Sequence, residues 1–525
     1  MIHTEIRKNA YYDSVTLMCV SKEMKKLSGI REALVGMGTE LNREIAQNTG
    51  LAGADFDKKV TANDFFAAVS ADDAASLKAA MDTMDALLNK KQTAEDKKTQ
   101  PATLSGAVEI DPALNMAIIS VPGRFAAGVA RSCLDRGIHV MLFSDNVTIE
   151  EERELKTYAV EKQLLMMGSD CGTAIVNHVP LAFANVVRPG DIGIVAASGT
   201  GTQEVSSLID RMGGGVSQVL GVGGRDLKQE IDGRMMQLAL TALMEDPKTN
   251  VIVLVSKPPA VEVAQKILRL AAGARQKVVV CFIGGDPALA ESFGLIPALS
   301  LEDAASKAVQ LSNGEALQEA PLFTMGDAEA ERLARVIAEK MHPSQQYIRG
   351  YYTGGTLCDE AMKLTIGALG HLYSNIPLQP MDRLENARAG EAREHTFLDF
   401  GDDAFTVGRP HPMIDPGLRA ERVANEGKHE ETAVVLVDCV IGYGSHEDPA
   451  EELSCAIRTA KKEAEAAGRY LAVVASVCGT EGDPQCLSKT QQKLTDAGAV
   501  VLPSNAQAAR FALKIMEQQK KEGTR

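Results

Sequence analysis

The sequence of 525 residues contains no tryptophan, and aromatic residues make up only 4% of the chain. A core without aromatic bulk must be aliphatic, and buried parallel strands prefer aliphatic side chains. The nine cysteines are scattered without CxxC pairs, so neither a disulfide framework nor a structural zinc site is indicated. We therefore expect reduced thiols, no metal and a cytoplasmic protein with an α/β core.

Long apolar runs and clusters of basic residues are also missing. No run approaches the length of a membrane span, and the N-terminal residues lack the apolar core of a signal peptide. Seventy acidic residues against 55 basic ones give a formal net charge of −15. Nucleic-acid binding requires clustered Lys and Arg. We expect no membrane and no nucleic-acid partner.

The length requires several domains, since a chain of 525 residues exceeds what one hydrophobic core supports. Residues 1–95 carry mixed strand and helix patterns and predict a small α+β module. The polar, charged stretch that follows is assigned to a linker over residues 96–112. Beyond it, apolar strands that alternate with helices predict an α/β fold with parallel sheets.

Three doubly wound units, of Rossmann or flavodoxin type, are expected after the linker. They occupy residues 113–187, 188–312 and 344–525, and residues 313–343 form a connection. Their expected strands are 117–121, 139–143, 164–168, 192–197, 219–224, 251–255, 278–283, 347–352, 434–437, 470–477 and 500–502. Several of these strands end in small polar residues, so the carboxyl ends of the sheets are the expected ligand sites.

The strongest local signal is a small-residue turn between an uncharged apolar run and an amphipathic stretch. It consists of Ser198, Gly199, Thr200 and Gly201. Glycine lets the backbone approach a ligand closely, and the free N–H groups at a helix start point at a negative group. The turn is predicted to bind phosphate or carboxylate. The alternative is a tight turn that needs glycine only for its backbone angles.

A second turn of the same kind follows the strand 347–352. Its residues Gly354, Gly355 and Thr356 again precede a helical pattern, and we predict anion binding there too.

Two cations follow strands in the second unit. Arg225 lies between Gly224 and Asp226, and arginine is suited to a bidentate grip on carboxylate or phosphate. Lys257 precedes two prolines, which would hold its ammonium group at the edge of the sheet. Gly224, Arg225, Asp226 and Lys257 are therefore predicted to bind substrate. The alternatives are a surface ion pair at Arg225 and a solvated lysine at Lys257.

A further polar turn contains Asp170, Cys171 and Gly172, which we also assign to substrate binding. Because no histidine is paired with Cys171 in the sequence, a buried packing cysteine is favoured over a nucleophile. The backbone of the loop, and not the thiol, is expected to contact the substrate.

The segment from Phe405 to Pro416 contains three prolines, which forbid regular structure and stiffen the chain. It displays Arg409, His411 and Asp415, which we predict to be catalytic. His411 is the best candidate for proton transfer, because histidine titrates near neutral pH. The alternative is a rigid connector between domains.

These motifs resemble those of the FdrA family over nearly the whole chain. Matching strings include Ala197-Ser-Gly-Thr-Gly201, Tyr352-Thr-Gly-Gly-Thr-Leu357 and Cys478-Gly-Thr-Glu-Gly-Asp-Pro-Gln-Cys486, and further matches lie at 119–123, 141–147, 180–185, 223–227, 255–259 and 406–416. The wider group is that of NDP-forming acyl-CoA synthetases, typified by succinyl-CoA synthetase. The resemblance implies that residues 113–187 form a CoA-binding-like unit. It also implies that the second and third units resemble parts of the α and β subunits.

Two departures from that group bear on mechanism. The region that corresponds to its phosphohistidine loop, residues 281–289, contains no histidine, which argues against a phosphohistidine intermediate. No ATP-grasp segment is visible, which argues against nucleotide-driven ligation by this chain alone. No cofactor is assigned, since the missing loop leaves CoA or nucleotide binding unsupported.

The resemblance implies a component of oxamate carbamoyltransferase in anaerobic allantoin and purine breakdown. That enzyme converts oxalurate and phosphate into oxamate and carbamoyl phosphate. The implied partners are these small anions and companion subunits in an oligomeric complex. The alternatives are a CoA-binding acyl-CoA synthetase subunit and a non-catalytic scaffold of the complex.

Overall fold

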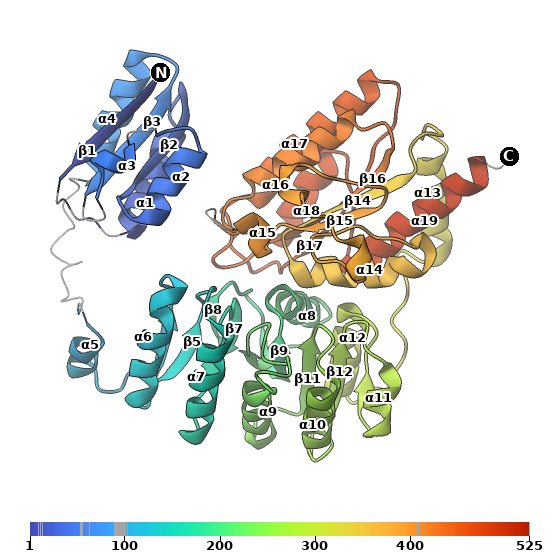
Figure 1. Ribbon diagram of the computed structural model, residues 1–525. Coiled ribbons are helices and arrows are strands. Elements are labelled where there is room, and N and C mark those ends of the chain that lie inside the picture. The colour runs from blue at the N-terminus through green and yellow to red at the C-terminus, as the bar shows by residue number, and fades with distance from the viewer. Residues whose placement is uncertain are drawn as a thin grey trace. The chain divides into compact units, whose positions relative to one another are not determined.

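The computed structural model describes residues 1–8, 10, 12, 14–52, 56–61, 64–88, 101, 103–406 and 410–523. The described chain divides into two compact units (Figure 1). Unit 1 comprises residues from Met1–Pro112, and unit 2 comprises Ala113–Thr406 with Pro410–Arg525. The expected α/β class is confirmed, with parallel sheets in unit 2.

Unit 1 is the predicted α+β module. Its antiparallel sheet has the order β1-β3-β2, and strand β3 separates the phenylalanines of its two faces. Phe65 packs with α1 and α4, whereas Phe66 packs on the opposite side with Phe56. The elements are β1 (Ile2–Arg7), α1 (Ser14–Lys25), β2 (Ile30–Met37), α2 (Glu40–Asn48), α3 (Phe56–Lys59), β3 (Phe65–Ala71) and α4 (Ala74–Leu88).

The stretch expected to be a linker contains a helix. Helix α5 (Leu104–Ile110) starts at Thr103, whose side chain accepts the N–H of Gly106 at 3.1 Å. A threonine cap supplies the acceptor that a short helix needs at its first turn. The earlier part of the expected linker, residues 96–100, lies outside the described residues.

Unit 2 begins with a small parallel sheet of order β4-β5-β6. Its strands and helices are β4 (Met116–Ile119), α6 (Gly123–Asp135), β5 (His139–Leu142), α7 (Ile149–Glu161) and β6 (Met166–Met167). Helix α7 starts with a capping box formed by Thr148 and Glu151.

The central sheet has seven strands in the order β13-β12-β11-β9-β10-β7-β8. The strands from β13 to β10 are parallel, and the hairpin of β7 and β8 joins them antiparallel. The elements are β7 (Thr173–Val176), β8 (Val179–Ala182), β9 (Pro189–Ala197), α8 (Gly199–Arg211), β10 (Val216–Gly221), α9 (Arg234–Glu245), β11 (Val251–Ser256), α10 (Val261–Ala271), β12 (Lys277–Phe282), α11 (Pro287–Ser292), β13 (Ile296–Pro297) and α12 (Leu301–Ser312). The hairpin thus precedes residue 187, the expected end of the first doubly wound unit, yet it pairs with the sheet of the second unit.

The third sheet is entirely parallel, in the order β15-β14-β16-β17-β18. Strand β15 was not expected, because a four-residue edge strand carries little periodicity. The elements are α13 (Asp327–Ala338), β14 (Tyr347–Tyr352), α14 (Gly355–Leu369), β15 (Thr396–Asp399), α15 (Asp403–Thr406), α16 (Gly417–Asn425), β16 (Thr432–Val440), α17 (Pro449–Ala466), β17 (Ala472–Cys478), α18 (Leu487–Asp496), β18 (Val500–Leu502) and α19 (Asn505–Gly523).

One hydrophobic core joins the central and third sheets. It contains Ile194 of β9, Leu436 of β16 and Leu357 of α14, all fully buried. Helix α8 packs against α12 and α14 between the two sheets, whereas α9 and α10 cover the other face of the central sheet (Figure 1). No described helix is long and apolar enough to cross a membrane.

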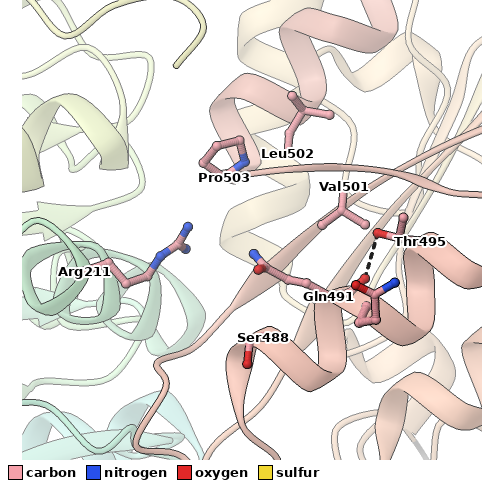
Figure 2. Close-up of a pocket in the computed structure, with 8 residues that line it drawn as sticks. Arg211, Ser488, Gln491, Thr495, Val501, Leu502 and Pro503 are labelled. Atoms are coloured by element: carbon pink, nitrogen blue, oxygen red, sulfur yellow. Dashed lines mark hydrogen bonds between the residues drawn. The ribbon is translucent and has the colours of Figure 1, made fainter. Parts of the chain in front are cut away.

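A pocket of about 520 Å³ lies where the end of α8 meets α18 and the loop after β18. Arg211 of α8 extends toward Gln491 of α18 and Pro503 across this space (Figure 2).

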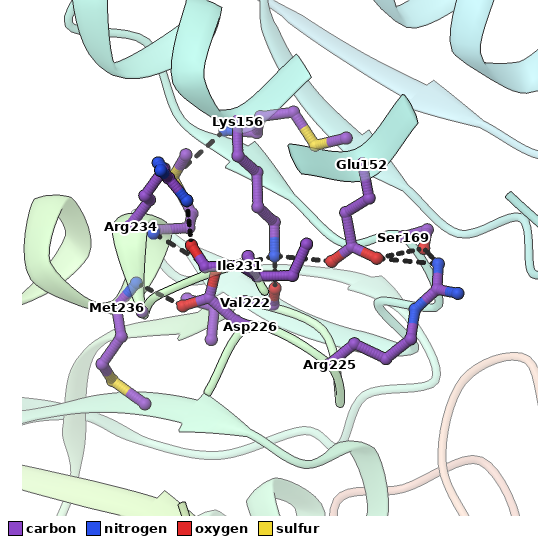
Figure 3. A network of polar contacts seen from close by, with 12 residues as sticks. Glu152, Lys156, Ser169, Val222, Arg225, Asp226, Ile231, Arg234 and Met236 are labelled. Carbon is purple, nitrogen blue, oxygen red and sulfur yellow. Dashed lines mark hydrogen bonds and ion pairs between the residues drawn. The ribbon is translucent and has the colours of Figure 1, made fainter. Parts of the chain in front are cut away.

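A buried charge network joins the β4-β5-β6 part of unit 2 to the central sheet (Figure 3). The Nζ atom of Lys156, on α7, lies 2.8 Å from a carboxylate oxygen of both Glu152 and Asp226, and donates to the carbonyl oxygen of Val222. Glu152 also pairs with Arg225 at 2.7 Å. The side chains of Lys156, Glu152 and Asp226 have no solvent exposure.

We predict that Lys156→Met destabilises unit 2 by about 3–5 kcal/mol, because two buried carboxylates would lose their shared cation. The matched control is Lys266→Met, which removes a half-exposed lysine paired with Asp232. The control should cost about 0–1 kcal/mol. Chemical denaturation followed by circular dichroism measures both, and equal effects would show that the network does not hold the sheets together.

Candidate functional site

The first predicted anion loop starts helix α8 at the carboxyl end of β9. Ser198 is the N-cap, and its hydroxyl oxygen accepts the N–H of Gly201 at 3.0 Å. Gly199 and Thr200 are partly exposed. Within the described chain, no acceptor is paired with their backbone N–H groups. These first-turn amides can therefore receive an anion.

The second predicted anion loop starts helix α14 at the carboxyl end of β14. The carboxylate of Asp438, on β16, accepts the N–H groups of Thr353 at 2.7 Å and Gly354 at 2.8 Å. Arg419 holds that carboxylate from the other side at 2.8 Å. Burial raises the pKa of Asp438, and Arg419 and the two amides act in the opposite direction. These hydrogen bonds hold the backbone of the loop where it leaves β14.

The structure brings the two anion loops into direct contact. The hydroxyl oxygens of Ser198 and Thr356 lie 2.7 Å apart. A Cβ atom at Gly354 would lie 2.8 Å from Oγ1 of Thr200, and one at Gly201 would lie 2.8 Å from Cγ2 of Thr356. Glycine is therefore required at both positions by close approach. Two helix N-termini, each partly positive, converge on one place, where an anion is favoured.

Asp399, at the end of β15, lies beside this meeting point. Its carboxylate accepts the N–H of Gly401 at 2.8 Å, and a Cβ atom at Gly355 would collide with it. Burial raises the pKa of Asp399 to about 7, although the nearby Lys257 acts to lower it. The group therefore exchanges a proton near neutral pH, as an acid or base must.

Lys257 reaches the site from the end of β11. Its Nζ atom pairs with Asp359 of α14 at 2.6 Å, and 44% of its side chain remains exposed. Burial acts to lower the pKa of Lys257, but Asp359 and Asp399 outweigh it and raise the pKa. The ammonium group stays charged and accessible, so it can also contact an anionic ligand.

His411 lies within the proline-rich segment and approaches Gly401 and Thr353 beside the same loops. Burial lowers the pKa of His411 to about 4, so the imidazole is neutral at neutral pH. Its Nδ1 atom accepts the N–H of Met413 at 3.2 Å, which leaves the proton on Nε2. A Cβ atom at Gly401 would lie 2.6 Å from Nε2, next to Asp399. The ring can donate a hydrogen bond there.

Other residues expected at the site have different positions. Arg409 lies outside the described residues. Asp415 is exposed, and its carboxylate accepts the N–H of Gly417 at the start of α16. Thr173 Oγ1 approaches the carbonyl oxygen of Gly199 at 3.4 Å, which places the loop with exposed Asp170 and partly exposed Gly172 next to α8.

Two of the expected substrate contacts need correction. Asp226 is fully buried and bound to Lys156, so it cannot reach a substrate. Nη2 of Arg225 already binds Glu152, Ser169 and the carbonyl oxygen of Val147, so this nitrogen is not available to a substrate, and Gly224 beside it is exposed. Cys171 is buried, as expected for a packing cysteine, and burial raises the pKa of its thiol to about 12, which does not suit a nucleophile.

The sequence analysis missed Asp399, Asp359, Asp438 and Arg419. Asp399 had a usable signal, because it ends the apolar run Phe397-Leu398 just before Gly401. Asp438 likewise follows the apolar run of β16. Nothing in the local sequence marks Arg419. Among the described residues, no group of three or more His, Cys, Asp or Glu side chains could hold a metal ion.

Three family models match segments of the chain. Residues 351–515 match the CoA-ligase model, residues 187–285 match the CoA-binding domain, and residues 1–103 match the "AllF, heavy metal-associated domain" model. The two anion loops lie inside the first two of these segments. The third segment contains one cysteine, Cys19.

Two ligase subunits match part of the chain. The α 2 subunit of the ADP-forming succinate–CoA ligase of Archaeoglobus fulgidus is 28% identical over 27% of this chain and 50% of its own length. The ADP-forming sulfoacetate-CoA ligase subunit SqwL of an Acholeplasma species is 26% identical over 33% of this chain and 59% of its own length. The chain thus spans half to three-fifths of these two relatives.

Solved structures match at low similarity. A dinucleotide-forming acetyl-coenzyme A synthetase of Ca. Korarchaeum cryptofilum gives a TM-score of 0.31 at 16% identity, over 78% of this chain and 84% of that one. The ATP citrate lyase of Methanothrix soehngenii gives 0.36 at 12% identity, over 81% and 86%.

A full-length relative is YahF of Escherichia coli, described as an uncharacterized protein. It is 43% identical over 97% of this chain and 98% of its own length. The chain therefore belongs to the family of YahF, and its segments 187–285 and 351–515 are of CoA-binding and CoA-ligase type.

Proposed function

We propose that this chain is a subunit of oxamate carbamoyltransferase, which converts oxalurate and phosphate into oxamate and carbamoyl phosphate. The observation that carries the proposal is the convergence of the α8 and α14 N-termini on one place, with Ser198 and Thr356 in contact. Phosphorolysis needs a seat for phosphate next to a group that can move a proton. The resemblance to the FdrA family and the AllF match of residues 1–103 support the choice of reaction.

In this reaction a phosphate oxygen attacks the carbamoyl carbon of oxalurate. The bond from that carbon to the oxamate nitrogen breaks, and the nitrogen takes a proton. The free amides of Gly199 and Thr200 would hold the phosphate, and Lys257 would offset its charge. The Ser198 hydrogen bond to Gly201 fixes the first turn of α8, and Asp359 holds Lys257, so these groups are in place before the reaction.

Two residues could supply the proton for the oxamate nitrogen. Asp399 has a pKa of about 7 and is protonated on a substantial share of molecules at neutral pH. His411 is neutral and carries its proton on Nε2, from which it could donate a hydrogen bond to the developing oxyanion. We assign proton transfer to Asp399 and hydrogen-bond donation to His411. This changes the role expected for His411, because burial makes it a weak base.

A second candidate function is that of a CoA-binding subunit of an acyl-CoA synthetase. The CoA-ligase and CoA-binding matches favour it. The amides of Gly199 and Thr200 lie inside the CoA-binding match and would fit an anionic group of CoA. Calorimetric titration with CoA separates the two functions, since only this second one requires tight CoA binding.

We predict that Gly354→Ala lowers phosphorolysis about 100-fold, the effect of displacing an oxyanion contact. The new methyl group would force Thr200 away and separate the two helix N-termini. The control is Gly367→Ala, on the same helix, where a Cβ atom would meet nothing within 4 Å. The assay follows carbamoyl phosphate formed from oxalurate by the complex with its companion subunits.

The control complex should keep the wild-type rate. A folded Gly354→Ala complex with full activity would show that the reaction does not occur at this site. Absence of carbamoyl phosphate in the wild-type complex would overturn the proposed function itself.

A second prediction concerns pH. Sulfate, which does not titrate near neutral pH, should bind this site more tightly at pH 6 than at pH 8. Asp399, with its pKa of about 7, is mostly neutral at pH 6 and mostly ionised at pH 8, where it repels an anion. The affinity should change roughly tenfold for each pKa unit by which sulfate raises the pKa of Asp399.

In Asp399→Asn the affinity should stay high across this pH range, whereas the control Asp232→Asn, at a partly exposed aspartate paired with Lys266, should behave as wild type. Calorimetry at each pH measures this. A wild-type protein whose affinity is the same at pH 6 and pH 8 would contradict the role of Asp399.

A further inference from the structure

We propose that the pocket at the far end of α8 is a separate binding site for a small monocarboxylate. Helix α8 runs from the anion loop at Gly199 to Arg211, which lines the pocket with residues of α18 and the β18–α19 connection (Figure 2). The volume of about 520 Å³ is within the usual range for small-molecule sites. The inference does not depend on the proposed function, because it concerns the opposite end of the helix.

The charged group of this site is an arginine without a partner. Nη1 of Arg211 is buried and has no hydrogen-bond acceptor, and no carboxylate of the described residues lies within ion-pair distance of the side chain. A buried donor without an acceptor costs free energy, more so when it is charged. A planar carboxylate in the pocket would bind the side of the guanidinium that lines it and offset its charge.

The nearby carboxylates that act on Arg211 through space each hold a hydrogen bond elsewhere, and Oε2 of Glu302 has no hydrogen-bond partner and lies 3.8 Å from Arg510. Glu204 accepts the N–H of Asn505 at 3.0 Å, and Glu302 accepts a hydrogen bond from Gln507 at 2.5 Å. On the opposite wall of the pocket, the polar groups of Ser488 also have partners. The N–H and hydroxyl of Ser488, at the start of α18, both bind Glu481. The N-terminus of α18 is therefore already neutralised.

The remaining lining defines the rest of the ligand. Gln491 faces Arg211 across the pocket, and no hydrogen bond engages its amide within the described chain. Val501, Leu502 and Pro503 provide an apolar wall. The site thus offers one guanidinium, one free amide and an apolar surface. This suits a monocarboxylate with a flat or apolar body.

The charge balance distinguishes this site from the anion loops. Arg211 lies in the last turn of α8, where the helix end is partly negative. One cation at a negative helix end favours a single negative charge, whereas a phosphate dianion would be opposed. A phosphate ligand is favoured instead at the α8 N-terminus, where the helix end is partly positive.

The test uses 4-bromobenzoate as the probe and 4-bromobenzamide as its neutral isostere. Calorimetry and crystals soaked with each probe, read at the bromine absorption edge, report affinity and position. We expect a bromine peak in the pocket with the carboxylate only. Arg211→Gln should weaken 4-bromobenzoate binding at least about tenfold, as expected for loss of a charge-assisted hydrogen bond.

The control Arg332→Gln removes one positive charge from an exposed arginine on α13 that pairs with Glu329, and should bind as wild type. Arg211→Lys keeps the charge and should retain part of the affinity, which covers the case in which Arg211→Gln does not fold. The proposal is overturned by a pocket without a bromine peak in crystals of the saturated protein. It is equally overturned by equal binding of the amide, or by folded Arg211 variants that bind as tightly as wild type.

Discussion

The N-termini of helices α8 and α14 approach each other closely, and this contact sets the geometry of the candidate site. Helices α8 and α14 begin at the carboxyl ends of two different sheets, and their first turns touch through Ser198 and Thr356. A larger residue in place of Gly201 or Gly354 would collide with the opposite loop. The shared core of the central and third sheets holds the helices in this position.

Two partly positive helix ends at van der Waals distance repel each other unless negative charge is placed between or beside them. The Asp438 carboxylate accepts two amides of the α14 loop, and Arg419 acts to lower its pKa against the effect of burial. Asp399 lies on the other side with a pKa near neutral pH. The partly exposed amides of Gly199 and Thr200 at the start of α8 have no acceptor among the described residues.

Much of the fold and part of the site were accessible from the sequence. The apolar runs predicted the long strands, and the two small-residue turns were recognised as helix starts, because both signals come from adjacent residues. The hairpin of β7 and β8 and the edge strand β15 were missed, since their short runs carry little periodicity. Arg225 was expected to bind substrate, but its Nη2 atom pairs with Glu152, which is far away in the sequence.

The amino-acid sequence was enough to predict the α/β class and to mark both small-residue turns as helix starts. The packing of distant segments brings these two turns together, buries Asp226 as a counter-ion and places Asp399 beside the meeting point. The physical reason is distance along the chain. Ser198 and Thr356 are separated by 158 residues, and their contact depends on how two sheets pack through a helical layer, which no local pattern encodes.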